Sequence, residues 1–215
     1  MKHIVITIVA VLLVGCWNKA ERALHTAAKQ GNIDSVRKAI DDGVNVDTVG
    51  YEGRTPLHEA AFAGHKDTVA FLISKGADVN VRDILCVTPM YWAAAGGHKD
   101  TVEFLASKGA DINARDGVIE AQSTGVVPLA NTRWTPLHIA SSQGRIAVVE
   151  FLISHGAEVN TTDNDDETPL DWTRIINEHD TVEDNERKAR NCPKIADLLR
   201  KHGGKTGAEL KAEGK

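Results

Sequence analysis

The chain repeats one arrangement of polar and apolar positions, which is clearest between residues 55 and 83. Thr55 and Pro56 suit the N-cap and the first turn of a helix, and small residues follow until Gly64. Beyond Gly64, apolar residues stand at the spacing of a helix with one buried face; they are Val69, Leu72 and Ile73. Gly76 suits the left-handed residue that ends a helix. The pattern therefore predicts two short helices joined by a tight turn, followed by an extended connector.

This unit recurs along the chain at a fixed period. Thr-Pro pairs begin at positions 55, 88, 135 and 168, so the steps are 33, 47 and 33 residues, and the long step is one period plus 14 inserted residues. Leu24-His25 precedes Leu57-His58 by the same 33 residues. One unit of this size cannot bury its own apolar face, so neighbouring units are expected to stack into a solenoid with a shared core.

The motifs inside the unit are specific. Thr-Pro-Leu-His stands at 55–58, and the units close on Gly-Ala-Asp-Val-Asn at 76–80, Gly-Ala-Asp-Ile-Asn at 109–113 and Gly-Ala-Glu-Val-Asn at 156–160. Over about residues 20–204 this pattern resembles the ankyrin repeat. The resemblance implies an all-α fold, an ankyrin-repeat solenoid of about five helix-pair repeats with hairpin-like connectors. The frames are 20–52, 53–85, 86–132, 133–165 and 166–204, and a polar tail, 205–215, follows them.

Two insertions depart from the period. Residues 117–130 lengthen the connector before the fourth repeat, and the apolar pairs 118–119 and 126–127 could form a short hairpin there. Residues 178–191 lie between the two helices of the fifth repeat and are strongly charged, so we expect a solvated helical extension over the end of the stack. The first and last repeats are polar variants of the motif, as expected of capping repeats.

The N-terminus has a different composition. Lys2 and His3 precede the almost wholly apolar run 4–14, which is too short to span a bilayer as a helix and is typical of a secretory leader. The sequence Leu-Val-Gly-Cys at 13–16 resembles a bacterial lipobox. We therefore expect a lipoprotein signal peptide over 1–15, acyl chains of the palmitate kind on Cys16, a short tether over 16–19, and a membrane-anchored protein on the periplasmic or extracellular face of a bacterial envelope. An ordinary leader with an incidental cysteine, or an uncleaved signal anchor, is the alternative.

The net charge argues against one class of function, and the cysteine positions argue against a disulfide. The formal net charge is −5, or −6 once residues 1–15 and their Lys2 are removed, and nothing in the sequence suggests the basic face that nucleic-acid binding needs. Cys86 and Cys192 lie about three repeats apart, so no disulfide is expected between them.

The chemistry-bearing residues mostly follow the repeat. The resemblance implies that His25, His58 and His138 make local hydrogen bonds and join adjacent connectors, and the remaining histidines also follow the frame or lie outside it. The acidic run 163–167 resembles the start of a calcium loop but lacks its glycine and its later bidentate glutamate. Asn160 forms a glycosylation sequon, yet it is the repeat's own asparagine. We expect no cofactor, no metal and no catalysis; a metal-dependent enzyme remains a remote alternative.

The resemblance implies that partners bind the connector tips and the exposed side of the first helices. Several large apolar residues fall at these positions, where clustered exposure would mark an interaction site. The candidate contacts are Tyr51, Arg54, Phe62, Ile84, Leu85, Val87, Asn131 and Trp134. The alternative is that Phe62 and Trp134 pack on neighbouring repeats. The sequence thus predicts a monomeric, non-catalytic protein–protein interaction module; an inhibitor or immunity-type protein that inserts residues 117–130 into one enzyme is the second reading.

Overall fold

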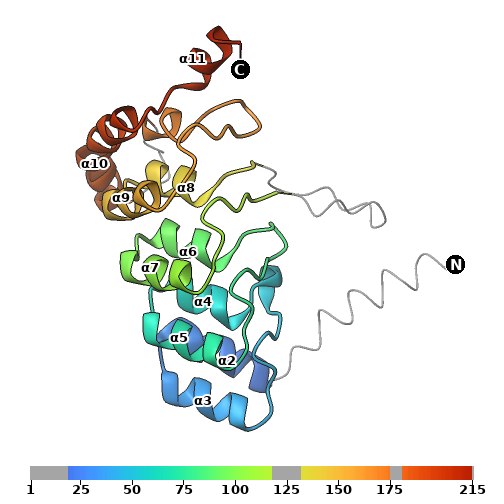
Figure 1. The fold of residues 1–215 in the computed structure, drawn as a ribbon. Helices are drawn as coiled ribbons and strands as arrows, with labels where there is room; N and C mark the ends of the chain where they lie inside the picture. The colour runs from blue at the N-terminus through green and yellow to red at the C-terminus, as the bar shows by residue number, and fades with distance from the viewer. Residues whose placement is uncertain (1–18, 118–131, 175–180, 215) are drawn as a thin grey trace, which may run out of the picture.

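The computed structural model of this chain describes residues 19–117, 132–174 and 181–214, and all regular elements within these ranges are helical. The helices stack in two rows, and the connectors extend to one side of the stack, on the right in Figure 1. The first helices of successive repeats are α2 (Lys19–Gln30), α4 (Pro56–Phe62), α6 (Pro89–Gly96) and α8 (Pro136–Ser142). The second helices are α3 (Ile33–Asp41), α5 (Lys66–Ser74), α7 (Lys99–Ser107) and α9 (Ile146–Ser154). The predicted all-α solenoid of helix pairs is confirmed.

The core runs through the stack as repeated rows of side chains. The leucine after each Thr-Pro, or the methionine that replaces it, is almost fully buried; these residues are Leu57, Met90, Leu137 and Leu170. Burying one such side chain contributes about 1.5–3 kcal/mol. Alanines at 60, 61, 93, 94 and 140 are 0 % exposed, and their small size lets the first helices of neighbouring repeats approach closely.

The predicted start and stop signals act as expected. Thr55 and Thr135 each form a capping box with the histidine three residues later, and Pro56 begins α4. Gly64 turns the chain between α4 and α5 at φ 75°, and Gly76 follows α5 at φ 97°. An L side chain is strained at such angles, so glycine supplies both reversals.

Each connector folds back on itself as a hairpin. In two connectors, an aspartate donates its backbone N–H to the carbonyl of the residue four positions later. Asp83 donates to Val87 over 3.1 Å, and Asp163 donates to Glu167 over 2.9 Å. Neighbouring connectors are joined as well, because Ile84 donates to the carbonyl of Glu52 over 3.2 Å. The connectors therefore form one continuous, hydrogen-bonded surface.

An asparagine ladder joins the repeats on another side. The Asn113 side chain donates to the carbonyl of Gly156 over 3.2 Å and accepts the N–H of Glu158 over 3.0 Å. Asn80 makes the equivalent pair of bonds to the following repeat, and so does Asn160. The Asn160 amide of the formal sequon is thus part of the scaffold.

The C-terminal repeat departs most from the expected unit. Its first helix is represented by a short 3-10 turn, η2 (Asp171–Arg174), and its second helix is α10 (Val182–Lys201). The charged insertion from residue 182 onward is the first half of α10, while 178–180 lie outside the described residues. The insertion is less solvated than expected, because Lys188 is buried and Arg187 donates to the carbonyl of Gln143 over 3.1 Å.

The polar tail also carries structure that the sequence prediction lacked. Residues Gly207–Ala212 form α11, which a capping box between Thr206 and Glu209 begins. The backbone N–H of Gly207 donates to the carboxylate of Asp171 over 2.7 Å, so the tail docks on the last repeat.

Two further findings concern the cysteines and the lengths of the helices. Cys86 and Cys192 are free and buried. Within the described ranges, no helix has the length and apolar character needed to cross a membrane. The predicted signal peptide 1–15, Cys16 and nearly all of the insertion 117–130 lie outside the described residues.

Candidate docking face

The predicted connector tips differ widely in exposure. Tyr51 is 80 % exposed, Ile84 is 60 % exposed and Phe62 is 41 % exposed. Val49, which the sequence prediction did not include, is 61 % exposed on the same connector as Tyr51. These four side chains are four of the five large apolar residues that the described part of the chain leaves exposed.

The first two connector tips lie directly against each other. Tyr51 opens the short 3-10 turn η1 (Tyr51–Gly53), and the Ile84 side chain of the next connector lies over Gly53. A Cβ atom on Gly53 would come within 2.7 Å of Ile84 Cγ2, so only glycine permits this approach. Tyr51 and Ile84 therefore belong to one surface, although 33 residues separate them.

Trp92 links this surface to the first helices. Its ring meets Phe62 of the preceding repeat edge to face, with ring centroids 5.5 Å apart. The Arg54 guanidinium lies 4.0 Å above the Trp92 ring and also pairs with Glu52 over 2.9 Å. Trp92 stands one residue beyond the motif position at 91 and is half-buried. Sequence reasoning missed it because the alanine-rich first helices gave no signal for an aromatic contact there. We call Val49, Tyr51, Arg54, Phe62, Ile84 and Trp92 the docking face.

Two of the candidates lie elsewhere than expected. Val87 is only 4 % exposed, and its carbonyl faces His58 Nε2 at 3.1 Å, so its placement among solvent-facing residues was wrong. It is buried because the connector folds back there and pairs with Asp83. Leu85 is half-buried, and Asn131 lies outside the described residues.

Trp134 mainly packs against side chains of the fourth and fifth repeats. Its indole N–H donates to the Asp163 carboxylate over 3.2 Å, and its ring lies 4.3 Å from Trp172, centroid to centroid. The same ring stacks on His138 at 6.3 Å. These contacts span the fourth and fifth repeats, as the packing alternative for this residue proposed.

One edge of Trp134 nevertheless lines a groove between the third and fourth repeats. The groove holds about 180 Å³, and its walls are Leu85, Val87, Tyr91, Trp92, Asp116, Thr132 and Trp134. Trp92 thus contributes to the docking face and to this groove, so the two are neighbours on the surface.

Three buried aspartates hold the connectors in shape. One oxygen of Asp83 accepts the N–H groups of Leu85 and Val87, and the other accepts the Trp92 indole N–H over 3.0 Å. Asp163 repeats this arrangement with the N–H groups of residues 165 and 167 and two indole donors. Both oxygens of Asp163 are therefore used, which removes the residue that the calcium hypothesis for 163–167 needs most.

Asp116 is the third of these aspartates. It accepts the Trp134 backbone N–H over 2.8 Å and the Thr132 hydroxyl over 2.7 Å. Burial raises the pKa of the Asp116 carboxyl, and these donors oppose the rise. Among the described residues, no Lys, Arg or His forms an ion pair with it.

The histidines serve the scaffold. His58 accepts the Thr55 N–H at Nδ1 and meets the Val87 carbonyl of the next connector at Nε2, as the resemblance implied. His98 Nε2 lies 3.0 Å from the carbonyl of Phe62, at the end of the preceding first helix. Burial lowers the pKa of His58, and it lowers the pKa of His138 to about 4. In the described part of the chain, no three His, Cys, Asp or Glu side chains converge in a way that could hold a metal ion.

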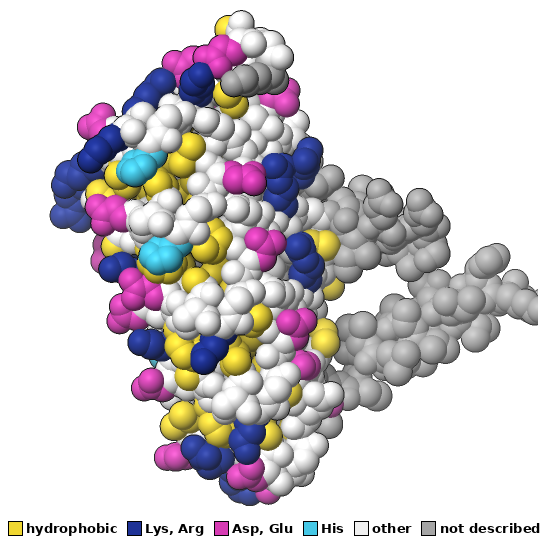
Figure 2. All heavy atoms as spheres, in the orientation of Figure 1, with side chains coloured by type: hydrophobic (Ala, Val, Ile, Leu, Met, Phe, Trp, Pro, Cys, Tyr) yellow, Lys and Arg dark blue, Asp and Glu magenta, His cyan; other side chains and the backbone are white. Residues whose placement is uncertain are grey.

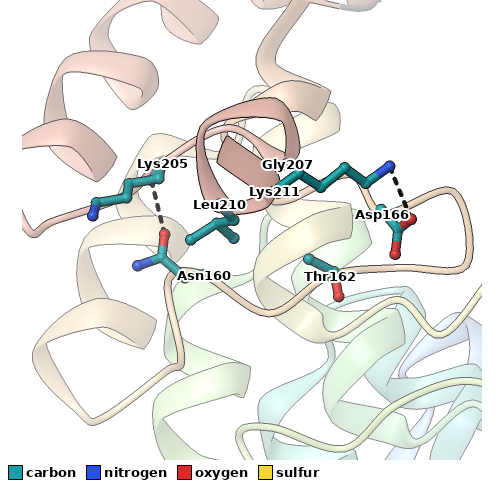
Figure 3. A pocket seen from close by; sticks show the side chains of 7 residues that line it. All are labelled: Asn160, Thr162, Asp166, Lys205, Gly207, Leu210 and Lys211. Atoms are coloured by element: carbon teal, nitrogen blue, oxygen red, sulfur yellow. Dashed lines mark hydrogen bonds and ion pairs between the residues drawn. The ribbon is translucent and has the colours of Figure 1, made fainter. Parts of the chain in front are cut away.

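A larger hollow, of about 500 Å³, lies between the last connector and α11 (Figure 3). Leu210 points into it from α11. Lys211 pairs with Asp166 over 3.0 Å, and the backbone N–H of Lys205 donates to Asn160 over 2.8 Å. Because these polar groups already hold α11 in place, the hollow is the seam of a docked helix and offers little to a ligand.

The surface charge is mixed. Figure 2 shows acidic and basic side chains interspersed along the whole visible face, with apolar side chains recurring in the recesses between them. No field of one sign covers that face, so charge there favours solubility over steering of a highly charged ligand.

Comparison with protein families gives a consistent result. Residues 5–83 match the family described as ankyrin repeats (3 copies), residues 87–117 match a single ankyrin repeat, and residues 126–171 match ankyrin repeats (many copies). A search of curated proteins gave no match to this chain.

Proposed function

The chain belongs to the ankyrin repeat family, and from that premise we propose that it is a non-catalytic protein-binding module that holds its partner on the docking face. The observation that carries the proposal is the exposure of Tyr51, Ile84 and Val49 on adjacent connectors, continuous with Phe62 on α4. Solvent-facing connector positions are usually polar, and clustered apolar exposure marks an interaction site.

The scaffold suits rigid docking. The connectors are joined by backbone hydrogen bonds such as that from Ile84 to Glu52, and the Arg54 guanidinium is held between Glu52 and Trp92. Little conformational freedom remains to be lost on binding, so more of the contact energy is available for affinity. Tyrosine, tryptophan and arginine are also the residue types that most often dominate binding energy.

Site-specific cross-linking in the native envelope tests this face. A photoreactive phenylalanine analogue at position 51 or 84 should capture the same partner chain, identified by mass spectrometry. The control is position 182, because Val182 is 77 % exposed but lies on α10, away from the docking face. Equal capture from all three positions, or no shared chain from 51 and 84, would contradict the proposal.

A variant separates contact from folding. Tyr51→Ser with Ile84→Ser should abolish capture through a cross-linker at position 62, while thermal unfolding changes little because both side chains are exposed. Val182→Ser is the matched control and should leave capture intact.

The proposed location is a membrane surface on the exported side of a bacterial envelope, with acyl chains on Cys16 as the anchor. The apolar leader and the Leu-Val-Gly-Cys sequence at 13–16 support it. Since α2 begins at Lys19, three residue steps of about 3.5 Å leave a tether of only about 10 Å. The polar first repeat would then lie close to the headgroups.

Metabolic labelling tests the anchor. The wild-type chain should incorporate an alkyne-tagged palmitate and sediment with membranes, and Cys16→Ser should lose both properties. Labelling that persists in Cys16→Ser, or a chain that remains soluble with Cys16 intact, would contradict the anchor without bearing on the docking face.

The inhibitor hypothesis depends on residues 117–130, which lie almost wholly outside the described residues. Deleting 118–130 discriminates between the two functions. An inhibitor should lose nearly all binding, whereas a module that binds through Tyr51 and Ile84 should keep most of it.

A further inference from the structure

The groove between the third and fourth repeats combines an apolar wall with an acidic floor. Tyr91, Trp92 and Trp134 supply aromatic surface, and Asp116 supplies a carboxylate. We propose that this groove receives an arginine side chain of the protein partner, with its guanidinium on Asp116 and its stem between the indoles. The inference rests on the proposed function and adds a chemical requirement for the partner, a protruding arginine beside an apolar patch.

The size of the groove limits its occupant. Its 180 Å³ corresponds to about six water molecules at roughly 30 Å³ each. Pockets for cofactors and drug-sized ligands hold about 300–1,000 Å³. The groove therefore fits one long side chain and is too small for a cofactor.

The aromatic wall favours a cation. Indole faces attract guanidinium groups more strongly than other aromatic rings do, and the planar guanidinium also stacks on them. The chain already shows this contact within itself, because the Arg54 guanidinium lies 4.0 Å above the ring of Trp92.

The polar groups of the groove lack a cationic partner. Asp116 is 9 % exposed, and its carboxylate accepts only from neutral donors, the Thr132 hydroxyl and the backbone N–H groups of Arg133 and Trp134. Each carboxylate oxygen can accept a further bond, and a guanidinium fork can reach both oxygens. Asp83 lies close enough to Asp116 to raise the pKa of its carboxyl, so the negative charges on this side reinforce each other.

Tyr91 gives independent support. Tyr91 is 9 % exposed and lines the groove, and its hydroxyl makes no hydrogen bond to another described residue. Burial and the charges of Asp116 and Asp83 raise the pKa of this hydroxyl, so it stays protonated. The protonated hydroxyl keeps lone pairs that can accept an N–H of a guanidinium in the groove.

One partner could cover the docking face and the groove together, because the two surfaces are neighbours. Trp92 belongs to both surfaces, so a partner whose apolar side chains cover Tyr51 and Ile84 would bring the adjacent part of its chain over the groove. An arginine there would satisfy Asp116 and exclude water from the edge of Trp134.

The test uses the full-length protein in non-ionic detergent and N-acetyl-arginine amide as the probe, with N-acetyl-citrulline amide as its neutral isostere. Indole N–H signals in ¹⁵N-labelled protein report on Trp92 and Trp134, and Trp→Phe variants assign them. The arginine probe, at tens of millimolar, should shift the Trp92 and Trp134 signals in a saturable way, while the citrulline probe should shift neither. Identical effects of the two probes, or no shift with either, would overturn the inference.

Asp116→Asn sharpens the test because asparagine keeps an oxygen for the Trp134 N–H, and its NH₂ group can donate to the Thr132 hydroxyl in place of the bond it accepted. It should weaken the arginine probe at least tenfold, as loss of a charge-assisted hydrogen bond implies. Asp100→Asn, an equal change of charge at an exposed site on α7, should leave affinity unchanged. Tyr91→Phe should cause a smaller loss, about threefold, and normal affinity in Asp116→Asn would refute the assignment.

The two proposals fail in different ways. If Asp116→Asn leaves partner cross-linking from position 51 intact and the arginine probe does not bind, the docking face stands and the arginine groove does not. If the probe binds the groove but positions 51 and 84 capture no shared partner, the site exists and the docking face is wrong.

Discussion

Lowering the pH from 6.5 towards 4 should destabilise this fold through His138. The histidine is 0 % exposed, and its Nδ1 atom accepts the backbone N–H of Thr135 over 3.1 Å. Protonation of Nδ1 would point a new N–H at the Thr135 N–H, and it would also place a positive charge in the core. Burial accordingly lowers the pKa of His138 from 6.5 to about 4.

The size of the effect follows from that shift. The unfolded chain takes up a proton near pH 6.5, whereas the folded chain resists until about pH 4, so the stabilisation is complete above 6.5 and is lost as the pH falls through this window. A shift of 2.5 pKa units, the difference between these values, corresponds to about 3 kcal/mol at roughly 1.4 kcal/mol per unit. Burial lowers the pKa of His58 in the same direction, which would add to the loss.

Guanidinium unfolding at half-unit pH steps across the window measures this loss. His138→Gln keeps an acceptor at the third helical position, where glutamine is a natural capping residue. Between pH 6.5 and 4, the free energy of unfolding of the variant should fall by about 3 kcal/mol less than that of the wild type. Tryptophan fluorescence is a suitable probe because Trp134 stacks on His138. His202→Gln, at the exposed end of α10, is the control. Parallel pH profiles for wild type and His138→Gln would refute the reasoning.

Four further predictions concern the scaffold and the acidic run 163–167. Asn113→Ala removes both bonds of one step in the asparagine ladder and should lower the free energy of unfolding by about 2 kcal/mol; an unchanged urea midpoint would contradict this. Arg133 is exposed at φ 59°, so Arg133→Gly should raise the melting temperature by relieving about 1 kcal/mol of strain, whereas Arg133→Ala should not. Asp163→Asn replaces one acceptor of two indole N–H groups by a donor and should cost about 3 kcal/mol. In wild-type protein, calcium should leave the melting temperature unchanged, and a saturable rise would restore the metal hypothesis for 163–167.

Much of the scaffold was predictable because its interactions are local and periodic. Thr55, Pro56 and His58 lie within one turn, and their capping depends only on residue type and spacing. The glycines at 64 and 76 were identified for the same reason, since left-handed backbone angles favour glycine wherever they occur. The role of His58 between connectors followed from the family resemblance, and the hydrogen bond to Val87 confirms it.

The candidate site was predicted less well. Exposure of a side chain at a connector depends on which groups of the next repeat meet it, and the sequence pattern does not encode that contact. Trp134 and Tyr51 hold comparable places at connector tips, yet Trp172 and Asp163 cover the first and nothing comparable covers the second. Trp92 was missed because its contacts with Phe62 and Arg54 come from the preceding repeat.

The sequence by itself determined the period, the helix pairs, the positions of the turns and the structural role of most histidines, because these depend on hydrogen bonds and backbone angles within a few residues. Only the tertiary structure decided that Val87 is buried, that residues 182–201 form one helix and that α11 docks on Asp171. Only the tertiary structure also brought Tyr91, Asp116 and Trp134 together around one groove. These outcomes depend on packing between repeats, where small differences in side-chain volume and in available donors decide which residue faces the solvent.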